Sequence, residues 1–80
     1  MTFVYILKSF KTGRFYYGST DNLDNRLMMH NSGKVKSTKA FKPWVLHYKE
    51  EYETRSLARK RELFFKTIDG YLWLKTKGIT

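Results

Sequence analysis

The sequence contains no cysteine and a single proline among its 80 residues. Without cysteine, neither a disulfide framework nor a cysteine-ligated zinc site can stabilise the fold or take part in its chemistry. A reducing compartment is the default for a chain of this kind. We therefore expect a cytoplasmic protein.

Long hydrophobic runs are lacking as well. No apolar run approaches the roughly 20 residues that span a bilayer, and no basic segment followed by an apolar run indicates a leader peptide. An amphipathic basic helix of the kind that lies on membrane surfaces is also absent. We therefore expect a soluble protein with no membrane partner.

Acidic residues are few. Seven Asp and Glu stand against 16 Lys and Arg, which gives a net charge of +9 and a pI of about 9.9. For so short a chain, this excess favours a polyanionic partner, and nucleic acid is the leading candidate. The alternatives are a basic surface that serves only solubility and an anionic membrane.

Aromatic residues are abundant, at 18% of the chain. A chain of this size buries only about 60% of its unfolded surface, so large aromatic side chains compensate for a small core. Repeats, low-complexity tracts and linkers are absent. Residues 1–80 are therefore predicted to form a single domain.

Two aromatic and β-branched runs near the N-terminus predict a β-hairpin. They are Phe3–Lys8 and Phe15–Thr20, and the polar break between them contains Gly13, which can adopt a left-handed turn. The hairpin brings Tyr5 and Tyr16 near each other. Cross-strand packing alone would account for two such tyrosines.

A helix is predicted to follow the hairpin, with Asp21 as its N-cap and its end near His30. At about 100° per residue, Leu23, Leu27, Arg26 and His30 share one sector of that helix. Arg26 and His30 are neighbours on its surface and face the hairpin. A surface arginine and a histidine that caps the helix C-terminus would give the same pattern.

Four lysines lie in the irregular segment from residue 33 to residue 42. They are Lys34, Lys36, Lys39 and Lys42. Together with Ser37 and Thr38 they suit contacts to phosphate oxygens, which position a duplex without reading its sequence. A solvated loop would have the same composition.

Residues Trp44–Tyr48 predict a third strand. Apolar side chains on both of its faces indicate a well-covered place in the sheet. Trp44 is expected in the core, and His47 is interpreted as a paired strand histidine rather than a metal ligand.

A second helix is predicted from a cap at Thr54 or Ser56 to about residue 67. Its inward stripe is formed by Leu57, Ala58, Arg61, Phe64, Phe65 and Ile68. Arg61 is a misfit in that stripe. The stretch Asp69–Leu74 predicts a turn and a short C-terminal helix.

Glu62 lies at the margin of the same stripe, where a carboxylate can face a cleft. Lys and Arg residues surround it in the sequence. An i,i+4 ion pair, which contributes only tenths of a kcal/mol, is the simpler role.

An ordered set of these residues resembles the GIY-YIG nuclease family. Val4–Ile6 and Tyr16–Gly18 correspond to its two motifs, followed by Asn22-Leu23, Arg26, His30 and Glu62. Gly13–Tyr16, His30–Lys34 and Pro43-Trp44 are similar to the small stand-alone bacterial branch of uncharacterised single-domain proteins. The likeness covers the chain from about Phe3 to Trp73.

The resemblance implies an α+β fold. It consists of a three-stranded antiparallel sheet flanked by helices, in the order strand, strand, helix, strand, helix. This order agrees with the elements predicted above, to which the sequence adds a short C-terminal helix.

The resemblance also implies catalytic roles. Tyr5 stands at the first motif's tyrosine, the family's usual candidate for the general base, and Tyr16 at the second motif's tyrosine. Arg26 corresponds to the phosphate-contacting arginine, His30 to the helix residue one turn on, and Glu62 to the single carboxylate that binds the divalent metal.

Three positions depart from the family pattern. Val4 replaces the first motif's glycine and Tyr17 the second motif's isoleucine, and both changes mainly alter strand packing. Ser19 stands where some catalytically strong relatives have lysine, which bears on catalytic strength.

The residue types suit phosphodiester hydrolysis. Tyr5 would orient and deprotonate the water, and because its unperturbed pKa is about 10, a cationic neighbour must lower that pKa and alkaline pH should help. His30 is the alternative base, since its pKa is nearer neutrality. Arg26 offers a bidentate fork to the phosphate. Glu62 can hold Mg²⁺ or Mn²⁺ once DNA supplies further oxygens.

We therefore predict a metal-dependent DNA endonuclease, a hydrolase that leaves a 5′ phosphate, with RNA as a further possible substrate. Sequence specificity should be low, because no base-reading module fits beside the core, although a preference for a DNA structure is compatible. The competing interpretation is a catalytically weak or inactive basic nucleic-acid-binding module. Glu62 favours the enzyme, since a pure binder gains nothing from a metal-binding carboxylate. Oligomeric state is left open.

Overall fold

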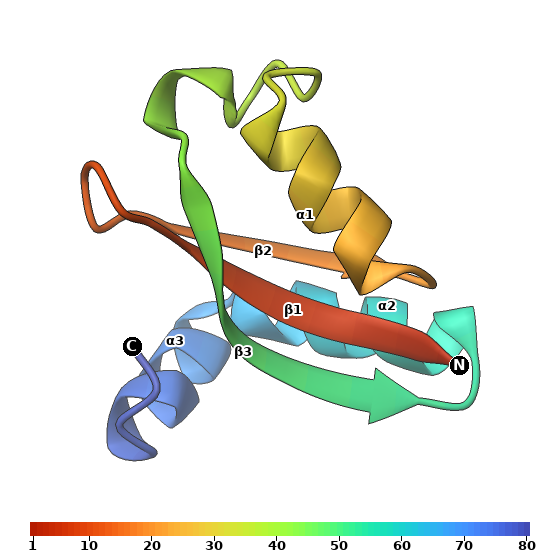
Figure 1. The fold of residues 1–80 in the computed structure, drawn as a ribbon. Coiled ribbons are helices and arrows are strands. Elements are labelled where there is room, and N and C mark those ends of the chain that lie inside the picture. The colour runs from red at the N-terminus through yellow and green to blue at the C-terminus, as the bar shows by residue number, and fades with distance from the viewer.

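The computed structural model describes residues 1–80 and contains one three-stranded sheet and three α-helices (Figure 1). The strands are β1 (Thr2–Ser9), β2 (Phe15–Thr20) and β3 (Trp44–Tyr52); the helices are α1 (Leu23–Asn31), α2 (Arg55–Phe65), α3 (Ile68–Thr76) and a 3-10 turn, η1 (Lys39–Phe41). Both strand pairs are antiparallel, in the order β2-β1-β3. The predicted α+β class and antiparallel sheet are confirmed.

The N-terminal hairpin supplies the middle strand of the sheet and one edge. Gly13 turns the chain with a φ of +78°, a conformation that glycine adopts without steric cost. In the resulting register Tyr5 lies opposite Gly18, and Leu7 opposite Tyr16. This register decides what surrounds the Tyr5 side chain.

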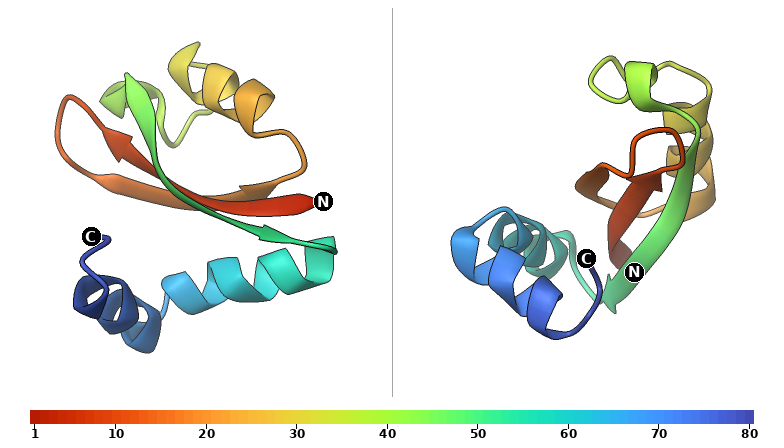
Figure 2. Two further views of the ribbon diagram at one scale, coloured as in Figure 1. Left: turned by 60° about the horizontal axis from the view of Figure 1, so that its bottom comes forward. Right: turned by 90° about the vertical axis from the view of Figure 1, so that its left-hand side faces the viewer.

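Helices cover both faces of the sheet, α1 on one face and α2 with α3 on the other (Figure 2). Because side chains alternate along a strand, β1 contributes to a separate small core on each face. The cluster towards α2 and α3 consists of Val4, Ile6, Ala58, Phe65 and Leu74, and the cluster towards α1 of Tyr5, Leu7 and Trp44.

β3 is an edge strand, so the predicted well-covered place in the sheet is wrong. Trp44 is in the core as expected, at 3% exposure, whereas Val45 and Leu46 are 46% and 40% exposed. The pairing register with β1 shifts where His47 has no partner. Such a bulge switches the alternation of side chains, so apolar residues appear on both faces of a strand that is only partly covered.

α1 begins one residue later than predicted. Its N-cap is Asn22, whose side chain accepts a hydrogen bond from the Asn25 amide at 3.0 Å. Asp21 instead accepts a hydrogen bond from the Thr2 hydroxyl and forms an ion pair with Arg55. A tertiary contact has therefore taken the expected capping residue.

α2 begins after Thr54, one of the two predicted caps. Ala58 and Phe65 are buried as predicted, but Leu57 and Ile68 are exposed. Ile68 leaves the predicted stripe because α2 ends at Phe65 and Ile68 opens the next helix, α3.

Arg61, the misfit of the sequence, forms a two-pronged ion pair with Glu50 on β3 at 2.8 and 3.2 Å. Glu50 also accepts hydrogen bonds from the hydroxyls of Tyr48 and Tyr52. The guanidinium lies over three aromatic rings, those of Phe64, Phe65 and Trp73. A cation on the inward stripe is tolerated because both its charge and its flat surface are matched.

Candidate active site

Tyr5 lies on the α1 face of the middle strand, and only 1% of its surface is exposed. Its ring crosses over the neighbouring strand at Gly18, where a Cβ would come within 2.5 Å of the Tyr5 hydroxyl. Glycine is required at this close approach. The hydroxyl is thereby carried from β1 to a position over β2.

The Tyr5 hydroxyl meets His30, a wholly buried residue of α1, with Oη and Nε2 3.3 Å apart. The other ring nitrogen, Nδ1, lies 2.8 Å from the hydroxyl oxygen of Thr38. That hydroxyl donates its own proton to the carbonyl of Val35. This contact favours the tautomer in which Nδ1 carries the proton and Nε2 accepts the Tyr5 hydroxyl.

Thr38 is 1% exposed, so the predicted phosphate contact at this residue is wrong. Its backbone carbonyl accepts a hydrogen bond from the indole of Trp44 at 3.0 Å. The loop places Thr38 inside the protein, where its hydroxyl contacts histidine rather than solvent. Ser37 beside it is exposed.

Tyr16 packs against both members of the buried pair. Its ring centroid is 4.8 Å from that of His30 and 6.4 Å from that of Tyr5. The predicted closeness of the two tyrosines is confirmed. Tyr16 is half-buried and lies on the strand that Tyr5 crosses.

The environment moves the pKa of both buried groups. Burial raises the pKa of Tyr5 to about 12, and the nearby Arg26 guanidinium lowers it too little to compensate. The expected cationic neighbour is therefore present and lowers this pKa, but burial outweighs it, so the expected net lowering is wrong. Burial also lowers the pKa of His30 below its usual 6.5, with Arg26 acting in the same direction. His30 is neutral at pH 7 as a result.

Glu62 projects from α2 towards the other face of the sheet. Its Oε1 accepts a hydrogen bond from the Ser19 hydroxyl at 2.7 Å, and its Oε2 pairs with Arg59 and Lys66, both at 3.0 Å. Burial raises the pKa of Glu62, but the hydrogen bond from Ser19 and the two cations outweigh burial and leave that pKa below its usual range. The i,i+4 pair expected from the sequence is confirmed, and the carboxylate is ionised at pH 7.

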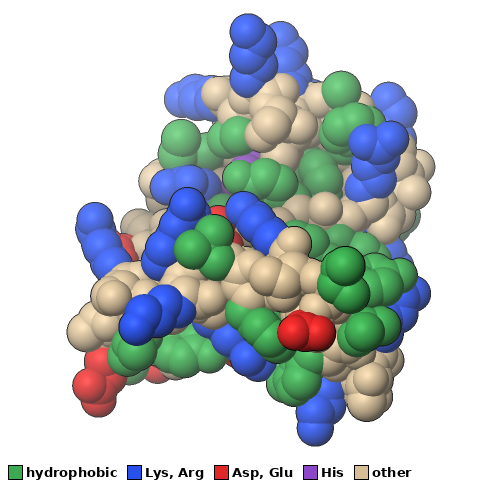
Figure 3. Space-filling model, turned by 180° about the vertical axis from the view of Figure 1, so that it is seen from behind, with side chains coloured by type: hydrophobic (Ala, Val, Ile, Leu, Met, Phe, Trp, Pro, Cys, Tyr) green, Lys and Arg blue, Asp and Glu red, His purple; other side chains and the backbone are tan.

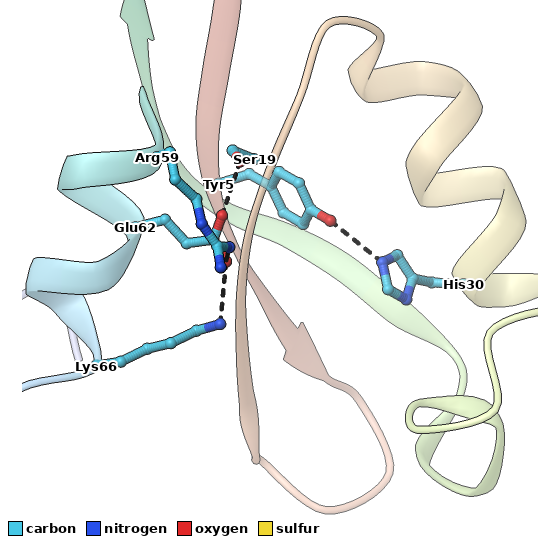
Figure 4. A network of polar contacts seen from close by, with 6 residues as sticks. All are labelled: Tyr5, Ser19, His30, Arg59, Glu62 and Lys66. Atoms are coloured by element: carbon cyan, nitrogen blue, oxygen red, sulfur yellow. Dashed lines mark hydrogen bonds and ion pairs between the residues drawn. The ribbon is translucent and has the colours of Figure 1, made fainter. Parts of the chain in front are cut away.

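The two groups of residues lie on opposite sides of β2 (Figure 4). A groove of about 450 Å³ lies at the end of that strand. Its lining is wholly polar: Thr2, Ser19, Thr20, Asp21, Asn22, Arg26, Arg55 and Arg59. Ser19 connects the groove to Glu62, and Arg26 also lines, with Tyr5, a small hollow against α1. Arg26 has no carboxylate partner.

No group of three or more His, Asp or Glu side chains gathers anywhere in the chain. A divalent ion bound by Glu62 would therefore take its remaining ligands from water and substrate, as Mg²⁺ commonly does. Oε1 of Glu62 has only the Ser19 hydroxyl as partner, so a lone pair remains for a metal. Glu62, with Ser19 beside it, can therefore supply one ligand to Mg²⁺ or Mn²⁺ but not a complete metal site.

Three of the four predicted nucleic-acid-binding lysines border a second basic hollow. Lys36, Lys39 and Lys42 line it together with Lys11 of the hairpin turn. Lys34 is exposed but does not belong to that lining. Hydrogen bonds from Ser9 and Phe10 hold the lysine segment against the start of the hairpin turn.

Sequence reasoning missed several residues that the structure brings to the site. They are Lys11, Arg55 and the inward-facing side chain of Thr38. Arg59 and Lys66 were expected around Glu62 from their helical spacing. Lys11, Arg55 and Thr38 reach the site only through tertiary contacts. His47 lies outside it, on β3, where its side chain bonds to the Ile79 carbonyl.

A family model described as the GIY-YIG catalytic domain matches residues 1–69. A UPF0213 protein of Staphylococcus haemolyticus is 40% identical over 74 residues, which span 91% of this chain and 89% of that protein. A UPF0213 protein of Bacillus pumilus is 44% identical over 66 residues, or 81% of this chain and 66% of that protein.

Among solved structures, the solution NMR structure of a UPF0213 protein from Bacillus halodurans is similar, with a TM-score of 0.55 and 30% identity. The match covers 95% of this chain and 84% of that one. None of the helices described above has the length and apolar character needed to cross a membrane.

Proposed function

The chain belongs to the GIY-YIG family, whose domain implies endonuclease activity, and from this premise we propose that it hydrolyses DNA phosphodiester bonds with a divalent metal ion and leaves a 5′ phosphate. The observation that carries the proposal is the polar groove lined by Arg26 and by Ser19, the residue that hydrogen-bonds Glu62, beside the small hollow that Arg26 shares with Tyr5. A phosphodiester in this groove would contact Arg26 and Ser19, with Glu62 behind Ser19 and Tyr5 on the other side of Arg26.

Arg26 is the proposed ligand of the scissile phosphate. Its guanidinium has no carboxylate partner and therefore keeps its full charge and its planar donor fork for an incoming anion. The charge that develops on the phosphate during attack would be stabilised by the same fork.

Tyr5 and His30 are proposed to remove the proton of the attacking water in two linked transfers. With a pKa of about 12, only about one Tyr5 in a thousand is ionised at pH 9, so free tyrosinate is a poor base. The neutral Nε2 of His30 can instead take the Tyr5 proton while the Tyr5 oxygen takes a proton from water. Water then attacks the phosphorus as hydroxide, the bond from phosphorus to the 3′ oxygen breaks, and the leaving 3′ oxygen takes a proton from solvent. The positive charge ends on His30, which returns its proton to solvent after the step.

Tyr16 and Glu62 complete the site. The half-buried ring of Tyr16 would keep the imidazole in place and separate it from bulk water. Glu62, with the Ser19 hydroxyl beside it, would hold the metal ion, which when bound would act as a Lewis acid for the phosphate oxygens.

The lysines of the loop are proposed to bind backbone phosphates rather than bases. Lys36, Lys39 and Lys42 border a hollow without aromatic residues, so no base-stacking surface accompanies their charge. Lys34, which lies outside the hollow, would add to the positive electrostatic potential that attracts the phosphates. Low sequence specificity, a cytoplasmic location and RNA as a further substrate complete the proposal.

A second candidate function is a nucleic-acid-binding module with little or no cleavage. One observation favours it: Oε2 of Glu62 already pairs with both Arg59 and Lys66. Metal binding at this carboxylate would have to compete with two cations held 3.0 Å away, and negative charge from a bound nucleic acid is needed to offset them.

Cleavage of end-labelled duplex, single-stranded and flap DNA, and of RNA, tests the proposal in the presence of Mg²⁺, Mn²⁺ or EDTA. We expect metal-dependent cutting of DNA. The products should be substrates for a ligase, because ligation requires the 5′ phosphate that the proposed reaction leaves. Salt-sensitive retardation of all substrates without cutting in either metal would instead establish the binding module.

A further inference from the structure

Beyond Arg26, the groove at the end of β2 contains a second anion site. We propose that Arg55, with the Thr2 hydroxyl, binds the backbone phosphate next to the scissile one, and that the Asp21 carboxylate occupies this place when nucleic acid is absent. The inference rests on the proposed nucleic-acid substrate and adds a subsite to it.

The groove is built for a sugar-phosphate backbone rather than for a base. None of its eight lining residues is hydrophobic, and three of them are arginines. A base needs an apolar or aromatic surface to stack on, whereas guanidinium forks match the oxygens of a phosphate. Figure 3 shows Lys and Arg side chains spread over one face of the molecule, with few acidic ones among them.

Asp21 already behaves as an anion bound in the groove. Its Oδ1 accepts a hydrogen bond from the Thr2 hydroxyl at 2.8 Å, and its Oδ2 pairs with Arg55. The two partners come from β1 and α2, so the carboxylate bridges elements that are distant in sequence. Asp21 was predicted to cap α1, but Asn22 caps that helix. The Asp21 carboxylate thus has the partners that a bound anion would have in this groove, a hydroxyl and a guanidinium.

The contact is one that a phosphate can displace. The side chains of Arg55 and Asp21 are 84% and 42% exposed, so solvent screens their ion pair and makes it weak. Arg55 therefore loses little when it changes partner. A backbone phosphate would gain two donors in exchange for a weakly held carboxylate.

The position of the groove relative to the lysine hollow gives the path of the strand. The groove lies at the Thr20 end of β2, and Lys11 at the opposite end of the hairpin. The six residues of β2 extend roughly 20 Å. Phosphates of one B-DNA strand are spaced about 3.4 Å along the axis, so about six nucleotides would connect the two basic regions along β2.

Fluorescence-anisotropy titration of a 12-base-pair DNA duplex in EDTA, at several NaCl concentrations, tests the inference. We expect Arg55→Gln to weaken binding and to lower the slope of log Kd against log salt by about 0.9, the value for one phosphate contact. Asp21→Asn should strengthen binding, because it removes the competing carboxylate. Thr2→Val should weaken binding without a change in charge.

Two variants with the same charge changes serve as controls. Lys75→Gln on α3 matches Arg55→Gln, and Glu53→Gln after β3 matches Asp21→Asn. If the groove variants change affinity and slope no more than these controls, only the total charge matters and the inference is overturned.

The design separates this inference from the proposed function. If wild type binds nucleic acid but never cuts it, the proposed nuclease activity is contradicted. The proposed subsite is then still decided by the binding titrations alone. Wild type that shows no salt-dependent binding to DNA or RNA contradicts both. Circular dichroism of Arg55→Gln and Asp21→Asn verifies that any loss is not unfolding, and a folded Arg55→Gln with wild-type affinity also overturns the inference.

Discussion

Thr38 determines the chemistry available to His30. A neutral imidazole carries its proton on either nitrogen, and only the form with a free Nε2 can accept the Tyr5 proton. The hydroxyl of Thr38 favours that form, because a hydroxyl that donates to the Val35 carbonyl is left to accept from Nδ1. Thr38 is a positioning residue, since it touches neither water nor phosphate.

Replacement of Thr38 by valine should lower the cleavage rate about 10- to 100-fold, the usual effect of a lost partner behind a functional histidine. Thr38→Ser keeps the hydroxyl and should retain most of the activity. Long-range ¹H–¹⁵N NMR spectra of the protein should place the wild-type His30 proton on Nδ1. A wild-type proton on Nε2, or equal rates for Thr38→Val and wild type, would refute the role.

The pH dependence of cleavage distinguishes the two candidate bases. Because the pKa of His30 is lowered, its neutral form is lost only as pH falls through a value below 6.5. Single-turnover cleavage should therefore rise with pH below that value and stay flat from pH 7 to pH 9. A rate that climbs tenfold per pH unit up to pH 9 would indicate free tyrosinate instead.

Most site residues could be predicted from sequence because each lies on a regular element at a recognisable spacing. Tyr5 and Tyr16 belong to paired strands, and Arg26 and His30 to one helix face. Thr38 could not be assigned, because it lies in an irregular segment whose direction is decided by contacts to α1 and to Trp44. A lysine-rich loop gives no signal for one buried threonine.

Among the elements, α2 is tied to both β3 and α3 through one arginine. Arg61 pairs with Glu50 on β3, and its guanidinium lies 4.3 Å from the ring centroid of Trp73 on α3. Both ion-pair members are mostly buried, with side chains 25% and 16% exposed. A polar residue on an inward stripe therefore connects three elements of a small protein.

Loss of this arginine should leave the Glu50 carboxylate without its cation. We expect Arg61→Met to lower the free energy of unfolding by about 2–4 kcal/mol, somewhat less than for a fully buried pair. Urea denaturation measures the change, with the exposed Lys60→Met as its control. The double variant Arg61→Met/Glu50→Gln should recover part of the loss; equal stability of Arg61→Met and Lys60→Met would contradict the account.

The elements themselves differ in how well sequence predicts them. The hairpin and α2 carry strong periodic and capping signals, and both have close to the predicted bounds. β3 was wrongly predicted to have a well-covered place in the sheet. A bulge in its pairing with β1 places apolar residues on both faces of what is an edge strand. A strand's position in a sheet depends on its partners, which local pattern does not contain.

At the scale of the whole molecule, the sheet separates the proposed catalytic groups into two sets. Tyr5 and His30 lie on the α1 face, whereas Glu62 reaches Ser19 from α2 on the opposite face. The order of these residues along the chain can be read from the sequence, but their separation by the sheet cannot. The groove is lined by Arg26 and Ser19, so a phosphodiester bound there, as proposed, would lie between the two sets.

The net charge of +9 is also organised at this scale. Composition predicts a polyanionic partner but not where it binds. The structure divides part of the charge between an arginine groove and a lysine hollow at opposite ends of β2. A strand of nucleic acid that follows β2 would meet both basic regions and pass the reactive groups between them.

The most direct test of the proposed nuclease is single-turnover cleavage of labelled duplex DNA in Mg²⁺ by wild type, Glu62→Gln and Tyr5→Phe. Glu53→Gln and Tyr71→Phe, exposed residues outside the site, are matched controls. We predict that both site variants lose about 10²- to 10⁴-fold in rate and that the controls cut like wild type. Cleavage that survives both site substitutions, or wild type that binds the duplex and leaves it intact, would contradict the account.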